Sequence, residues 1–98
     1  MHVRREVEDF TEKMEFKLSM HDDRPGWKEC DWEWLLGRLR EETYEIEKVL
    51  RERGDGWITK MWQECADVAN FAMMIQDAET FKWARRKAIE MGDSPLPE

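Results

Sequence analysis

Apolar residues recur along most of the chain three or four positions apart. Over residues 3–22, Val3, Val7, Phe10 and Met14 follow this spacing with charged residues between them. An apolar stripe of this period is typical of an amphipathic helix that packs against a core. No long run of β-branched residues alternates with a period of two, so strands are not expected.

Glycine and proline separate the helical segments. They gather in RPGW (24–27), GDG (54–56) and GDSPLP (92–97), and such clusters interrupt helices. Asp31 is suited to cap the N-terminus of the second helix. The pattern predicts helices over about residues 3–22, 32–53, 57–77 and 79–91. We therefore expect an all-α fold, an antiparallel helical bundle of about four helices in a single domain over 1–98, with 92–98 as a flexible tail.

Composition narrows the class of protein. The 98 residues are 40% charged with a net charge of -7, and acidic and basic residues are interleaved, which disfavours nucleic-acid binding. Cys30 and Cys65 lie too far apart to suggest a zinc site or a disulfide framework. We find neither a signal-peptide pattern nor an apolar run of membrane-spanning length. The expectation is a soluble, cytoplasmic protein with no membrane partner, and a chain this short favours completing its core by oligomerisation.

Four carboxylates fall at or near apolar stripes, where charged residues are unusual. At 100° per residue, Glu42 lies within the stripe of the second helix and Glu45 at its edge. Glu64 and Asp67 repeat this arrangement on the third helix. The midpoints between 42 and 67 and between 45 and 64 both fall within the GDG turn. If that turn closes an antiparallel hairpin, Glu42 lies level with Asp67 and Glu45 level with Glu64.

Converging carboxylates repel one another, and a hard divalent cation relieves that repulsion. Mg²⁺ and Mn²⁺ prefer oxygen ligands and bring substrate phosphates into their coordination shell. The sequence therefore predicts a Mg²⁺ (or Mn²⁺) site at Glu42, Glu45, Glu64 and Asp67. Ordinary surface acids are the alternative interpretation. A ferritin-like di-iron centre needs ExxH pairs, and neither His2 nor His21 follows a glutamate by three positions.

The segments EETYE (41–45) and ECADVANFAMMI (64–75) together resemble the MazG-like family of all-α nucleoside triphosphate pyrophosphohydrolases, in particular its short phage-type members. That family carries an ExxE helix followed by an ExxD helix, matched here by Glu42, Glu45, Glu64 and Asp67. The resemblance covers about residues 24–77. It implies a Mg²⁺-dependent enzyme that hydrolyses a nucleoside triphosphate to the monophosphate and pyrophosphate. It also implies a homodimer or homotetramer whose subunits help to complete the site.

Further residues are candidates for roles around the cluster. Glu41 is a candidate general base, and Asn70 a candidate outer ligand or water-binding group. Helical positions point Arg38 and Lys60 toward the carboxylates, where they are candidates to bind phosphates, Lys60 also assisting catalysis. Lys82 and Arg86, spaced i to i+4, are a second candidate cation pair. The resemblance places recognition of the nucleobase at the first helix and the loop after it, so Phe16, His21 and Trp27 are the candidates for that role. Two alternatives stay open, a non-catalytic nucleotide or metal sensor and a helical interaction module.

Overall fold

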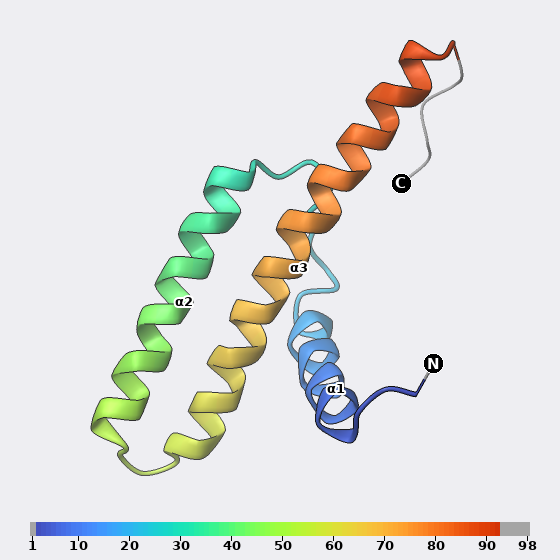
Figure 1. The fold of residues 1–98 in the computed structure, drawn as a ribbon. Helices are drawn as coiled ribbons and strands as arrows, with labels where there is room; N and C mark the ends of the chain where they lie inside the picture. Colours follow the sequence, from blue (N-terminus) through green and yellow to red (C-terminus); the bar gives the residue numbers. More distant parts are fainter. Residues whose placement is uncertain (1, 93–98) are drawn as a thin grey trace.

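The computed structural model describes residues 2–92, and within that range the chain forms α-helices and no strand. The helices are α1 (Arg5–Ser19), α2 (Trp32–Glu52) and α3 (Trp57–Glu90). Helix α2 runs antiparallel to α3, and α1 packs at an angle against the N-terminal half of α3 (Figure 1). The predicted all-helical architecture is confirmed for these residues.

The number of helices differs from the prediction. The third and fourth predicted helices form one continuous helix, α3, of 34 residues. The expected break at 77–79 is absent because residues 57–91 contain neither glycine nor proline, and Ala78 at this point is only 1% exposed. The C-terminal part of α3 extends well beyond the end of α2 (Figure 1).

A tight turn joins α2 to α3. Arg53 ends α2 with a left-handed backbone (φ 44°), and its amide donates a hydrogen bond to the Val49 carbonyl at 2.8 Å. Gly56 precedes α3 with φ 73°, a conformation that glycine adopts at little cost. Asp31 occupies the N-cap position of α2 as predicted, although its carboxylate makes no capping hydrogen bond.

Helix α1 is held against α3 by polar and aromatic contacts. The Asn70 amide donates a hydrogen bond to the Met14 carbonyl at 3.1 Å, and the rings of Phe16 and Trp62 are 6.0 Å apart. Helix α1 is shorter than the predicted 3–22, so the connection to α2 covers residues 20–31. Of the predicted tail 92–98, only Gly92 belongs to the described residues.

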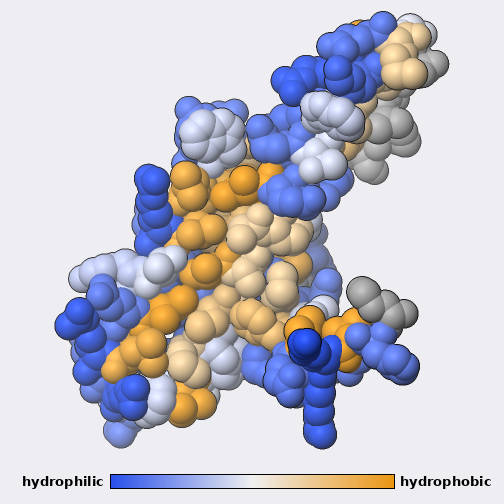
Figure 2. All heavy atoms as spheres, in the orientation of Figure 1, coloured by the Kyte–Doolittle hydropathy of each residue, from blue (hydrophilic) through white to orange (hydrophobic). Residues whose placement is uncertain are grey.

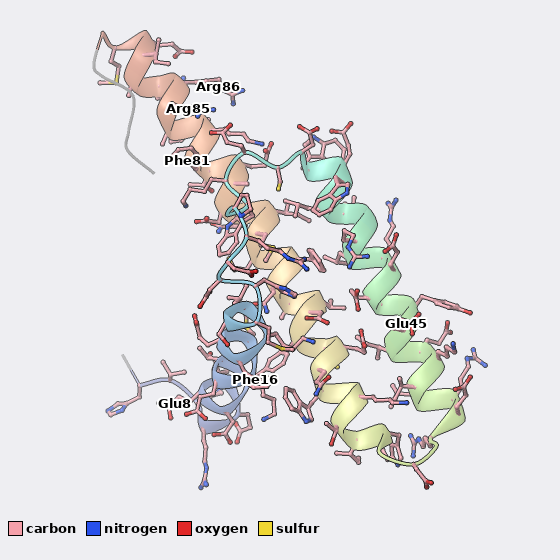
Figure 3. The ribbon with its side chains drawn as sticks, turned by 180° about the vertical axis from the view of Figure 1, so that it is seen from behind. Glu8, Phe16, Glu45, Phe81, Arg85 and Arg86 are labelled. Carbon is pink, nitrogen blue, oxygen red and sulfur yellow. The ribbon has the colours of Figure 1, made fainter. Side chains whose placement is uncertain are left out.

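The core of the chain is small. Among the described residues, the buried apolar side chains are Leu35, Ala66 and Ala78. Figure 2 shows apolar side chains gathered over the seam between α2 and α3, while the 20–31 connection crosses the opposite face, seen in Figure 3. No described helix combines the length and apolar character needed to cross a membrane.

Candidate metal centre

Three carboxylates meet between the two antiparallel helices. Glu42 comes from α2 and Glu64 and Asp67 from α3, and one oxygen of each lies within 4.8 Å of the others. The side chains of Glu42 and Asp67 are 15% and 24% exposed. Their position follows from the sequence, because both helices turn an apolar stripe toward each other and these acids lie within or beside those stripes.

The register across the turn brings together one of the two pairs expected to be level, Glu42 and Asp67. Glu42 lies beside Asp67, and it also lies beside Glu64, one turn nearer the start of α3. Glu45 is outside this group of three, although it is close enough for its charge to act on Glu64. Figure 3 shows Glu45 on the middle of α2.

Glu64 is the most perturbed acid of the cluster. Burial, hydrogen bonding to the Glu42 carboxyl, and the charges of Glu42, Asp67 and Glu45 together raise its pKa to about 8. Its Oε2 is buried, and no hydrogen-bond partner for it exists among the described residues. A buried acceptor without a partner is costly, so this oxygen is where a cation would relieve the largest penalty.

Asp67 is subject to opposing effects. Burial raises its pKa, the nearby Lys17 ammonium lowers it, and the Glu42 carboxylate raises it again. The Lys17 Nζ lies 3.5 Å from Asp67 Oδ2. The net direction is upward, so the cost of burial outweighs the compensation from Lys17.

Arg38 connects the cluster to its surroundings. Its guanidinium donates to Glu42 Oε1 at 3.4 Å, pairs with Glu41 and lies 5.4 Å from the centre of the Phe71 ring. Cations therefore contact the cluster from α2, through Arg38, and from α1, through Lys17.

Asn70 is buried beside the acids. Its side chain is fixed by the hydrogen bond to Met14, and its Oδ1 is buried without a partner among the described residues. The residue is 3% exposed and lines the same small cavity as Asp67. It therefore offers a second unsatisfied oxygen near the carboxylates.

Two cavities adjoin the cluster. The smaller, about 110 Å³, is lined by Glu42, Asp67, Asn70 and Lys17. The larger, about 670 Å³, lies between the end of α1, the 20–31 connection and α2. The two are neighbours, because both are lined by Leu18, His21, Arg38, Phe71 and Met74.

Several predicted site residues lie elsewhere. Lys60 is exposed and lines neither cavity. Glu41 is exposed and paired with Arg38, outside the group of three acids. Lys82 donates to the Cys30 carbonyl at 2.6 Å. Arg86 lies on the extension of α3, away from the carboxylates (Figure 3).

Two of the three candidates for base recognition line the larger cavity, and the third does not. Trp27 and His21 line the larger cavity, whereas Phe16 is 52% exposed and packs on Trp62. Sequence reasoning missed Lys17, because nothing in the pattern of α1 distinguishes it from the other basic residues there. Its role depends on how α1 crosses α3, which the sequence does not specify.

Comparisons of the chain with models of known families, with curated proteins and with solved structures find no match. The class that fold and site define is thus an all-helical protein with a half-buried cluster of carboxylates between two antiparallel helices.

Proposed function

We propose that this protein is a Mg²⁺-dependent hydrolase that cleaves a nucleoside triphosphate, NTP or dNTP, into the nucleoside monophosphate and pyrophosphate. The observation that carries the proposal is the group of Glu42, Glu64 and Asp67, whose oxygens lie within 4.8 Å of one another while Glu64 Oε2 has no partner. The resemblance of these segments to MazG-like enzymes supplies the reaction.

The residues fit a hard divalent cation. All the donors are oxygens, from Glu42, Glu64 and Asp67, with Glu45 nearby, and this set suits Mg²⁺ or Mn²⁺. The raised pKa of Glu64 reflects mutual repulsion and burial. A bound cation would relieve the repulsion and compensate for the cost of burial, and it would also offset the net charge of -7 that otherwise repels a triphosphate.

When bound, the metal would neutralise charge on the phosphates and acidify a water molecule. The remaining chemistry belongs to the chain. Arg38 and Lys17 line the small cavity beside the carboxylates, where their cationic groups would bind phosphate oxygens in place of Glu42 and Asp67. The hydrogen bond to Met14 holds the Asn70 side chain, and its Oδ1 would accept a hydrogen bond from the substrate or from water.

The candidate general base and the remaining cations have less support. Glu41 is near Arg38 but exposed, and Lys60 lines neither cavity. Lys82 and Arg86 lie on the extension of α3 and would reach a substrate only in an assembly. We therefore assign the binding of phosphate within one chain to Arg38 and Lys17.

We further propose that two or four copies associate through the α2–α3 face. The accessible surface is 7711 Å² for 11.9 kDa, whereas a compact monomer of this mass exposes about 5900 Å². The radius of gyration, 16.5 Å, likewise exceeds the roughly 13 Å of a compact 98-residue chain. The apolar face in Figure 2 is the surface that a second copy would cover.

The direct test is to identify products. The purified protein is incubated with each common NTP and dNTP and Mg²⁺ or Mn²⁺, and phosphorus NMR identifies what forms. We expect monophosphate and pyrophosphate, lost in Glu64→Ala and Asp67→Ala and retained in Glu47→Ala, whose side chain is 55% exposed on α2.

Other outcomes would reject the enzyme. Diphosphate and phosphate would contradict the assigned bond. No turnover, with melting still raised by divalent cations, would favour a nucleotide or metal sensor. No turnover and no response to metal would leave a helical interaction module.

A further inference from the structure

The larger cavity has an aromatic wall with one side chain held in place. Trp27, Trp34 and Phe71 line this space, together with cationic groups such as Arg24. Aromatic faces beside cations suit a flat heteroaromatic ring. Because this cavity adjoins the small one beside the carboxylates and shares five lining residues with it, a nucleotide with its phosphates at the acids would place its base here.

Trp27 is fixed by a residue far away in the sequence. Its indole Nε1 donates to Asp77 Oδ2 at 2.8 Å, and Lys28 Nζ donates to the same oxygen at 2.8 Å. Both contacts lower the pKa of Asp77, Lys28 more than Trp27, so this carboxylate remains charged and a strong acceptor. Lys28 and Asp77 are each about one-third exposed, at 34% and 35%.

The same stretch of chain is attached to α3 at two further points. Lys82 donates to the Cys30 carbonyl at 2.6 Å, and Arg85 pairs with Glu29 at 2.5 Å. Phe81 and Arg85 are labelled in Figure 3 on the part of α3 beyond the hairpin. The continuity of α3 through residue 78 thus gives residues 27–30 a rigid support.

We propose that Asp77 is a positioning residue that orients Trp27 as a stacking platform for the base of the substrate. This inference rests on the proposed function and deepens it. A donor that points to a fixed carboxylate leaves the indole with one orientation, and a preoriented ring loses little entropy when a base stacks on it. Asp77 itself acts through Trp27 and need not touch the ligand.

The test is isothermal titration calorimetry with Mg²⁺ and two kinds of ligand, the common ribo- and deoxynucleoside monophosphates and inorganic pyrophosphate. Trp27→Ala is expected to weaken the best mononucleotide on the order of 10-fold, as for one lost base stack, with pyrophosphate unaffected. Asp77→Ala is expected to weaken the mononucleotide several-fold. Asp77→Asn should lose less, because an amide oxygen still accepts from the indole.

The decisive comparison is a double-mutant cycle. If Asp77 acts through Trp27, Asp77→Ala has no further effect on mononucleotide affinity in the Trp27→Ala background. Gln76→Ala, an exposed neighbour on α3, is the matched control and should change neither ligand. Circular dichroism checks that each variant is folded. If Asp77→Ala is unfolded, Asp77→Asn takes its place in the cycle.

Three results would overturn the inference. The first is that Asp77→Ala weakens mononucleotide binding equally in the wild-type and Trp27→Ala backgrounds. The second is that Asp77→Ala weakens pyrophosphate binding as much as mononucleotide binding. The third is the absence of mononucleotide binding by the unmodified protein. Triphosphate hydrolysis without the expected cycle would reject only the role of Asp77, whereas failure of wild-type hydrolysis rejects the proposed function whatever the titrations give.

Discussion

A half-buried carboxyl group that keeps its proton near neutral pH is costly to ionise, and Glu64, whose Oε2 is buried, is such a group. Burial contributes most to raising its pKa to about 8, and the neighbouring acids Glu42, Asp67 and Glu45 raise it further. Lys17 and Arg38 compensate Asp67 and Glu42, whereas Glu64 Oε2 has no hydrogen-bond partner among the described residues. The acids are therefore arranged at a cost in stability, which a functional site explains better than packing does.

The first prediction concerns the pH dependence of stability without metal. The folded protein keeps the Glu64 proton up to about pH 8, whereas the unfolded chain releases it near 4.5. The folded state binds more protons in this window, so the free energy of unfolding falls as pH rises through it. Glu64→Gln cannot ionise. In EDTA we expect a smaller decline in Tm from about pH 5 to 8 than in the wild type, and a Tm several degrees higher at about pH 8.

Differential scanning fluorimetry over a pH series measures both proteins. Glu47→Gln, at an exposed position of α2, is the control and should follow the wild type. Identical pH profiles for wild type and Glu64→Gln would show that Glu64 is not perturbed.

The second prediction concerns Lys17. Its ammonium competes with a cation for Asp67, so Lys17→Met is expected to tighten Mg²⁺ binding several-fold. The same change removes a phosphate-binding group, so the KM for the triphosphate should rise several-fold. Calorimetry and steady-state kinetics measure the two effects. Lys13→Met, one turn earlier on α1, is the control and should change neither quantity. If Lys17→Met raised both the Kd for Mg²⁺ and the KM, or lowered both, this assignment would be refuted.

Sequence reasoning succeeded at the residue scale where helical period and register suffice. The neighbourhood of Glu42 and Asp67 follows from two apolar stripes and the turn between them. Lys17 and Asp77 could not be found in this way. Both act across elements whose separation and crossing angle depend on packing, and neither belongs to a motif.

At the scale of elements, the α2–α3 hairpin is the unit that positions the acids. Leu35, 1% exposed, is the largest fully buried side chain of the described residues and packs at the start of α2. Ala66 and Ala78 on α3 are buried as well, at 0% and 1% exposed.

The third prediction follows from this packing. Leu35→Ala is expected to lower the free energy of unfolding by about 2–5 kcal/mol, the usual cost of a buried leucine with a residual cavity. Urea denaturation followed by circular dichroism measures it. Tyr44→Ala, at a side chain 62% exposed on the same helix, should cost less than about 1 kcal/mol. Equal losses would mean that Leu35 is not central to the hairpin.

Helix boundaries were predicted well where glycine or proline marks them and poorly elsewhere. The GDG turn gave the end of α2 and the start of α3 within a residue. The expected break near residue 78 has no glycine or proline to mark it, and the helix continues through it. Asp77, next to this point, has tertiary partners in Trp27 and Lys28, and such a use of a polar side chain is invisible in a single sequence.

At the scale of the whole molecule, the exposed apolar area is the dominant feature. Leu50 and Ile58, on the two sides of the turn, are 36% and 53% exposed, and the α2–α3 face in Figure 2 carries further apolar side chains. A chain with few buried residues gains most of its additional stability by covering such a face.

The fourth prediction is therefore an assembly. Light scattering after size-exclusion chromatography is expected to give a mass near two or four times 11.9 kDa. Ile58→Glu should lower that mass. Val7→Glu, at a residue 50% exposed on α1, should not. A wild-type mass of one chain at about 50 µM, well above the Kd of a stable dimer, would refute the assembly.

The central claim is that the carboxylates between α2 and α3 bind a divalent cation. Isothermal titration calorimetry with Mn²⁺ near pH 8 tests it on the purified protein without substrate. The account predicts at least one ion bound per chain, loss of that binding in Glu64→Ala and retention in Glu47→Ala. A wild-type protein that binds no Mn²⁺, or a Glu64→Ala variant with unchanged affinity, would contradict it.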